Sequence, residues 1–256
     1  MEEVKKSFEE LLLIMDKLRE KCPWDREQTF ESLRNLTIEE TYELADAIIK
    51  KDMDEVRKEL GDLLLHIVFY SKIGSETGSF DIKSVIDGLC KKLIFRHPHV
   101  FGDTDVKNNS EIVKENWEEL KQKEGNKSVL GGVPNSLPAL IKANRIQEKV
   151  RAVGFDWEEK EQIWDKVREE FREVEQEVEN KDMKKLEKEI GDLFFSLVNA
   201  ARLYGIDPET ALENTNLKFM KRFNFLEQQT IKKGRPLKNM TLDEMNEIWE
   251  EAKKFD

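Results

Sequence analysis

Residues 39–73, EETYELADAIIKKDMDEVRKELGDLLLHIVFYSKI, and residues 169–203, EEFREVEQEVENKDMKKLEKEIGDLFFSLVNAARL, are two copies of one stretch. The copies align without a gap from Glu39 on Glu169 to Ile73 on Leu203, and about a third of the aligned positions are identical. Each copy reads EExxE, then a spacer of the same length in both, then ExGD. An internal repeat of this length predicts two lobes of similar structure.

The composition indicates an all-α protein. Of the 256 residues, 38% are charged, and only 6 are proline and 12 glycine. Frequent Glu, Lys and Leu with few helix breakers are typical of helical folds. We therefore expect two tandem helical lobes, each built on an acidic hairpin. The first domain is expected over residues 1–123, the second over 138–256, and a linker rich in Gly, Pro, Asn and Ser over 124–137.

Charge and cysteine content narrow the choice of partners and compartment. The net charge is −11 and no long run of Lys and Arg occurs, which argues against a nucleic-acid partner. Cys22 and Cys90 form no CxxC motif, as expected of free thiols in a reducing compartment. No signal peptide is recognisable, and no apolar run approaches the roughly 20 residues of a membrane span. We expect a cytoplasmic protein without a membrane partner.

The repeated stretch predicts a helical hairpin. In the first copy a helix is expected to begin at Thr37, with Glu40 three residues later as its capping-box partner. The sequence KDMD then predicts a turn, in which Asp52 caps a second helix that ends near Gly74. Residues 63–73 are apolar nearly all round, which suggests packing against a second subunit.

The hairpin brings four acidic residues of each copy to the same distance from its turn. Glu40 and Glu43 share a face of the first helix, and Glu59 and Asp62 share a face of the second. Both pairs lie roughly 12 Å from the turn at 1.5 Å per residue, so antiparallel packing places them side by side. The equivalent residues of the second copy are Glu170, Glu173, Glu189 and Asp192.

These acidic residues predict a metal site in each lobe. Four facing carboxylates repel one another unless a proton, a cation or water separates them. Oxygen ligands without His or Cys suit Mg²⁺, with Mn²⁺ as a substitute. A solvated acidic helix surface is the alternative, but both copies keep all four acids although their spacers have diverged. Gly61 and Gly191 lie inside the expected helices, where glycine costs about 1 kcal/mol relative to alanine. They indicate a close helix approach or a ligand.

Matching cations and tryptophans follow each copy. Two cations four residues apart share a helix face and suit the phosphates that a metal does not hold, although ordinary surface charge is the alternative. A tryptophan can stack on a base or pack in the core. These residues are Lys92, Arg96, Trp117 and Lys121 after the first copy and Lys218, Arg222, Trp249 and Lys253 after the second.

At this point the chain resembles a known family, the all-α nucleoside triphosphate pyrophosphohydrolases. The resemblance rests on the two acidic motifs and on four further segments, and it covers nearly the whole chain. The two-lobed arrangement resembles the MazG branch of that family. The segments are CPWDREQTFESL at 22–33, RHPHVFG at 96–102, GGVPNSLPAL at 131–140 and VGFDW at 153–157.

The resemblance implies a function and a role for each residue. It implies hydrolysis of nucleoside triphosphates to the monophosphate and pyrophosphate, with Mg²⁺ on the acidic residues, in a dimer whose helices pair into bundles. The four acids of each copy would bind metal. As a mechanistic hypothesis beyond the resemblance, Glu40, Glu43, Glu170 and Glu173 are also taken as catalytic, with Glu40 or Glu170 orienting or deprotonating the attacking water. The substrate-binding residues would be Glu39, Lys92, Arg96, Trp117 and Lys121 in the first lobe and Glu169, Lys218, Arg222, Trp249 and Lys253 in the second.

Three other functions remain compatible with the residues. The chain could be a nucleotide-sensing module without turnover, or an interaction protein that uses the apolar residues 63–73 and 193–203. It could also be an NTPase that releases phosphate rather than pyrophosphate. No residue identifies a preferred base, so broad specificity and selection of non-canonical nucleotides are both open.

Overall fold

The computed structural model describes the whole chain except residues 108, 110, 111, 114, 115, 118, 119, 121–127, 233, 235 and 256. The elements that it describes are all helices, which confirms the all-α prediction. The chain divides into two compact units, Met1–Ser110 and Glu111–Asp256. The linker expected at 124–137 begins among residues outside the description, so that boundary stays a prediction.

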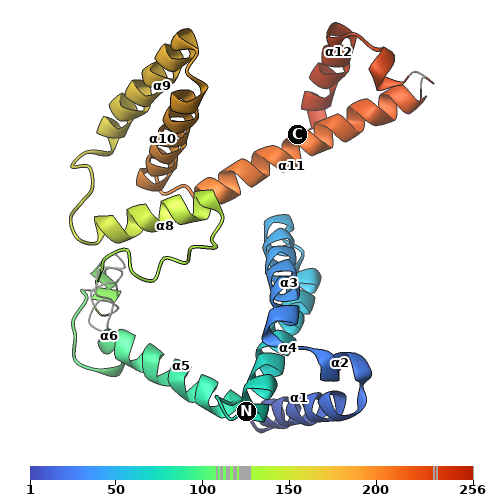
Figure 1. Cartoon of the computed structure of the whole chain (residues 1–256), viewed down its shortest axis with the longest axis vertical. Coiled ribbons are helices and arrows are strands. Elements are labelled where there is room, and N and C mark those ends of the chain that lie inside the picture. The colour runs from blue at the N-terminus through green and yellow to red at the C-terminus, as the bar shows by residue number, and fades with distance from the viewer. Residues whose placement is uncertain are drawn as a thin grey trace. The chain divides into compact units, whose positions relative to one another are not determined.

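An antiparallel hairpin of α3 and α4 forms the centre of the first unit (Figure 1). Helix α1 packs against α4, and α5 follows α4 in the chain and contacts it. None of the described helices combines the length and the low charge that a helix needs to cross a bilayer. The helices of this unit are α1 (Glu2–Lys21), α2 (Pro23–Glu27), α3 (Phe30–Lys50), α4 (Met53–Glu76), α5 (Ile82–Arg96) and α6 (Pro98–Phe101).

Helix α3 begins at Phe30, seven residues before the expected start. The Thr29 hydroxyl accepts a hydrogen bond from the Ser32 backbone N–H, and the Ser32 hydroxyl accepts one from the Thr29 N–H. Thr37 lies within the helix, where its hydroxyl donates to the Leu33 carbonyl. The predicted start at Thr37 is therefore wrong. Two capping sequences compete in this segment, and the earlier one allows Leu33 to reach the core.

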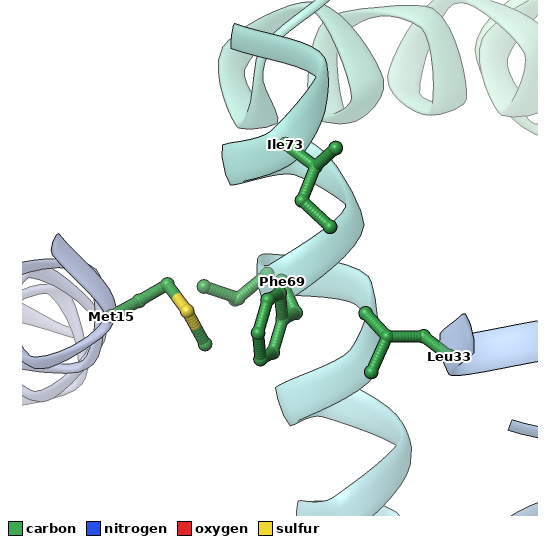
Figure 2. Close-up of a cluster of buried hydrophobic side chains, with 5 residues drawn as sticks. Met15, Leu33, Phe69 and Ile73 are labelled. Carbon is green, nitrogen blue, oxygen red and sulfur yellow. The ribbon is translucent and has the colours of Figure 1, made fainter. Parts of the chain in front are cut away.

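The core of the first unit lies where α1, α3 and α4 meet. Figure 2 shows Met15 of α1 and Leu33 of α3 on either side of Phe69 of α4. Ile73 and Val68, also on α4, complete this group of buried side chains. Burying one side chain of this size contributes about 1.5–3 kcal/mol. This packing holds α3 against α4 and so sets the acidic faces of the two helices beside each other.

The turn of the hairpin has the same conformation in both units. Lys51 and Lys181 adopt the left-handed region, with φ of 58° and 56°. The next residue caps the second helix: the Asp52 carboxylate accepts hydrogen bonds from the backbone N–H groups of residues 54 and 55, and Asp182 does the same two and three residues on. The predicted turn and its capping aspartate are confirmed.

The second unit repeats the hairpin with α9 and α10, which pack against each other (Figure 1). Ile163, at the position equivalent to Leu33, is also 1% exposed. Helix α10 contacts α8 and α11, and α12 packs on α11. The elements are α8 (Ala139–Arg151), η1 (Lys160–Gln162), α9 (Ile163–Asn180), α10 (Met183–Leu203), α11 (Pro208–Lys232), η2 (Leu237–Asn239), α12 (Leu242–Ala252) and η3 (Lys253–Phe255).

Candidate metal and nucleotide site

Each hairpin gathers three carboxylates. Oxygen atoms of Glu40, Glu43 and Glu59 lie within 4.8 Å of one another, and we call this group the first carboxylate cluster. The hairpin therefore brings residues of two helices together as the spacing predicts. Asp62 does not belong to the group, although its charge acts on Glu40. The second carboxylate cluster consists of Glu170, Glu173 and Glu189, and Asp192 lies outside it.

Burial and mutual repulsion shape the first carboxylate cluster. Burial raises the pKa of Glu40 above its usual value, and a hydrogen bond with Glu59 and the charges of Asp62 and Glu43 raise it further. The pKa of Glu59 is lowered, chiefly because the Lys58 ammonium donates a 2.9 Å hydrogen bond to Glu59 Oε1. Glu59 is 0% exposed, yet its Oε2 has no hydrogen-bond partner among the described residues.

A lysine pairs with the second carboxylate cluster from within α9. Lys166 Nζ lies 2.8 Å from Glu169 Oε1 and 2.7 Å from Glu170 Oε1. Lys188 on α10 approaches Glu189 at 3.5 Å. Burial raises the pKa of Glu173, and the charges of Glu170 and Glu189 add to this effect. The second cluster is thus more fully compensated by lysine than the first.

The sequence analysis does not identify these lysines as partners of the acidic residues. Lys166 precedes Glu170 by four residues, a spacing at which helical side chains meet. Lys58 and Lys188 occupy equivalent positions of the repeat, directly before the buried glutamate. Both signals were present in the sequence, but lysine–glutamate pairs at such spacings are frequent in a chain this charged.

The carboxylate clusters fit a hard divalent cation. Buried polar atoms in proteins are almost always hydrogen-bonded, so the bare Glu59 Oε2 is a candidate ligand atom. The three carboxylates of each cluster offer oxygen alone, which is the donor type that Mg²⁺ and Mn²⁺ prefer.

The helical glycines are not explained by packing within the chain. A Cβ atom added to Gly61 or to Gly191 would meet no described heavy atom within 4 Å. The expectation of a close helix approach is therefore wrong for the described part of the chain, because no helix lies near enough to exclude a methyl group. The ligand that the sequence analysis offers as the other explanation stays a prediction.

The cation and tryptophan predicted in the second unit do meet. The Arg222 guanidinium lies 5.7 Å from the centre of the Trp249 ring, and Phe219 lies 5.0 Å from the same ring. Lys253 donates a hydrogen bond to Glu250 on α12, and Lys218 is exposed on α11. Trp249 is thus half-buried against α11, with a cation on one side.

The equivalent residues of the first unit are less completely described. Lys92 is exposed and Arg96 half-buried, both on α5, and Trp117 is half-buried. Lys121 lies outside the described residues. Glu39 is exposed on α3, next to the first carboxylate cluster, as Glu169 is next to the second.

The main electrostatic influences on Glu40 and Glu173 come from their own hairpins. The largest influences on the pKa of Glu40 come from α3 and α4, and those on the pKa of Glu173 come from α9 and α10. The cations on α11 are not among them. In the second unit the acidic hairpin and the group around Trp249 are two separate parts of the predicted site.

An all-α chain with two carboxylate hairpins, each followed by a helix that carries two cations, fits the class of all-α nucleotide pyrophosphohydrolases. The model of the MazG nucleotide pyrophosphohydrolase domain matches residues 28–101 and 158–225, so that each hairpin lies within a match. The chain belongs to the MazG nucleotide pyrophosphohydrolase family. This confirms the family and the enzyme class that the resemblance implies.

Curated relatives align with all or part of the chain. It is 45% identical over 251 residues to the nucleoside triphosphate pyrophosphohydrolase/pyrophosphatase MazG of Thermotoga maritima, covering 96% of this chain and 95% of the relative. It is 42% identical over 256 residues to the nucleoside triphosphate pyrophosphohydrolase of Escherichia coli, covering 96% and 97%. A protein of the same name from Mycolicibacterium smegmatis is 38% identical over 148 residues, 56% of this chain and 45% of the relative.

Proposed function

We propose that the chain hydrolyses nucleoside triphosphates to the monophosphate and pyrophosphate in a Mg²⁺-dependent reaction. The names of its full-length relatives support this reaction. The observation that carries the metal dependence is the first carboxylate cluster, in which a fully buried glutamate keeps an oxygen without a hydrogen-bond partner among the described residues.

The carboxylates of each cluster would hold the cation. Bound Mg²⁺ supplies positive charge for the triphosphate and lowers the pKa of a bound water. Glu40 and Glu173 have raised pKa values, so each is suited to take a proton from the attacking water. Glu170, which the sequence analysis assigns to the attacking water in the second lobe, is ion-paired with Lys166.

The group around Trp249 would hold the nucleotide. Arg222 suits phosphate oxygens because its guanidinium presents several donors in one plane. The aromatic faces of Trp249 and Phe219 suit stacking, which tolerates any base. We therefore propose broad base specificity, compatible with the removal of non-canonical nucleotides.

A second copy of the chain would complete the site. Exposed apolar residues at the same positions of α4 and α10 form a stripe beside the glycines that face open space. A stripe of this spacing is typical of a helix that pairs with another helix. We propose a homodimer, which sedimentation equilibrium would test. The residues of the stripe are Leu60, Leu64 and Ile67 on α4 and Ile190, Phe194 and Leu197 on α10.

The test of the function removes one carboxylate in each lobe. Glu43→Gln and Glu173→Gln are made singly and together, and pyrophosphate and phosphate are measured separately with Mg²⁺ present. Each single change is expected to lower turnover in its own lobe at least about 10- to 100-fold, because losing even a residue that only contacts a metal ligand typically costs that much. Glu179→Gln, an exposed change on α9, is the control.

Three results would contradict the proposal. Undiminished pyrophosphate release by the double variant would show that the carboxylate clusters are not the site. Calorimetric binding of a triphosphate without any product would instead favour the nucleotide-sensing module. Release of phosphate alone would identify the other kind of NTPase.

A further inference from the structure

The two lobes differ at the position four residues before Glu40 and Glu170. When the gap-free alignment of the two copies is extended towards the N-terminus, Lys166 on α9 corresponds to Leu36 on α3. Leu36 packs against the hydrophobic core of the first unit. The first lobe therefore has an apolar side chain where the second has an ammonium group.

Lys166 occupies carboxylate oxygens that a metal would need. Its Nζ lies 2.7 Å from Oε1 of Glu170, a side chain only 8% exposed. A divalent cation binds carboxylate oxygen at about 2.0–2.1 Å and would lie within a few ångströms of this ammonium. The two cations repel at that distance, and partial burial reduces the screening by salt. Lys166 therefore opposes metal binding at Glu170 Oε1.

A second position increases the difference in charge. Glu55 on α4 corresponds to Lys185 on α10, and each lies four residues before the buried glutamate of its cluster. In the first lobe Glu55 shares Lys58 with Glu59, at 2.7 Å and 2.9 Å from its Nζ. At these two positions together the first lobe is more negative by three charges, one from position 36 and two from position 55.

The buried glutamates reflect the same difference. Glu59 is 0% exposed and keeps an oxygen without a partner among the described residues. The side chain of Glu189 is 15% exposed. The first cluster therefore keeps an unsatisfied buried ligand atom beside one lysine, Lys58, whereas the second cluster is paired with two lysines, Lys166 and Lys188.

We propose that Lys166 is an internal counter-cation of the second carboxylate cluster, so that one chain contains a tight and a weak site for divalent cations. The first cluster binds the cation at low concentration. The second binds it only when Lys166 has been displaced. This inference rests on the proposed metal dependence and adds an order of occupancy to it.

The experiment titrates the full chain with Mn²⁺ in the absence of nucleotide, by calorimetry and by the electron paramagnetic resonance of the free ion. Two classes of site are expected, with dissociation constants about tenfold apart. Glu43→Gln should remove the tight class and Glu173→Gln the weak one, which assigns each class to its lobe. Neither readout depends on turnover.

The decisive variant is Lys166→Leu, which gives the second lobe the residue of the first. It is expected to tighten the weak class about three- to tenfold and to leave the tight class unchanged. Changing a residue that contacts a metal ligand typically alters metal affinity about 10- to 100-fold. We expect a smaller effect here because Lys166 is 37% exposed and water screens its charge. Lys238→Leu makes the same chemical change on η2, outside the hairpin, and should alter neither class.

Three results would overturn the inference. The first is a weak class that Lys166→Leu leaves unchanged while circular dichroism shows intact helices. The second is equal affinity of both classes in the unmodified chain. The third is a tight class that is lost with Glu173→Gln. Absence of Mn²⁺ binding at either cluster would instead contradict the proposed metal site itself.

Discussion

Glu40 links the acidity of the solution to the stability of the first hairpin. Burial and neighbouring carboxylates raise its pKa, so its ionisation opposes folding in the metal-free chain. The stability that the protonated Glu40 contributes is complete below its ordinary pKa of 4.5, and it is lost as the pH rises through the raised pKa. Relieving the repulsion with Glu40→Gln is expected to stabilise the chain at pH 7 by about 0.5 kcal/mol, the size of a like-charge pair on a helix.

Urea denaturation in EDTA between pH 4.5 and 7.5 measures this effect. The difference between Glu40→Gln and the unmodified chain should shrink as the pH falls towards 4.5. Glu9→Gln, an exposed change on α1, serves as the control. A difference that grows on acidification would contradict the assigned direction of the pKa shift.

The sequence predicts the acids of the site better than their partners. The spacing of Glu40 and Glu43 on one helix and Glu59 on the next is enough to bring them together across a short turn. Which cation compensates them depends on side-chain conformation, and Lys166 is one of many lysines with a glutamate four residues away. The position of Asp62 outside the cluster is likewise a matter of helix rotation that periodicity alone does not determine.

At the scale of the element, the capping aspartate of each turn is the feature most open to test. Asp182 accepts hydrogen bonds from two backbone N–H groups at the start of α10. Asp182→Ala leaves them without this acceptor and is expected to destabilise the second unit by about 1 kcal/mol. Chemical denaturation measures the loss, and Glu175→Ala, an exposed position in the middle of α9, is the control. Equal stability of both variants would show that water replaces the cap.

The start of α3 shows why element boundaries are harder to predict than the hairpin itself. Thr29 and Thr37 are both plausible caps by their local sequence. The choice between them depends on Leu33, which is buried against Met15 and Phe69 only if the helix has already begun. That contact joins residues distant in the sequence, so the local pattern could not reveal it. The turn could be predicted from the local sequence because the residue in the left-handed region and the capping aspartate are neighbours in the chain.

At the scale of the molecule, the two compact units are expected to unfold in separate steps. Leu33 and Ile163 are equivalent residues, each 1% exposed, and each lies in a different unit. Truncating either to alanine is expected to cost about 2–5 kcal/mol in its own unit. Differential scanning calorimetry should show Leu33→Ala lowering one transition and Ile163→Ala the other. A single transition that both variants lower equally would show that the units unfold together.

The short hairpin turn also has a consequence for the order of folding. Glu40 and Glu59, which meet in the first carboxylate cluster, are separated in the chain only by the turn and the helical segments that flank it, and Glu170 and Glu189 repeat this separation. Closing so short a loop costs little entropy, and contacts local in sequence form fast. Each cluster can therefore assemble as soon as its own hairpin has left the ribosome. We expect the carboxylates of the first cluster to be in place before the second lobe has been synthesised.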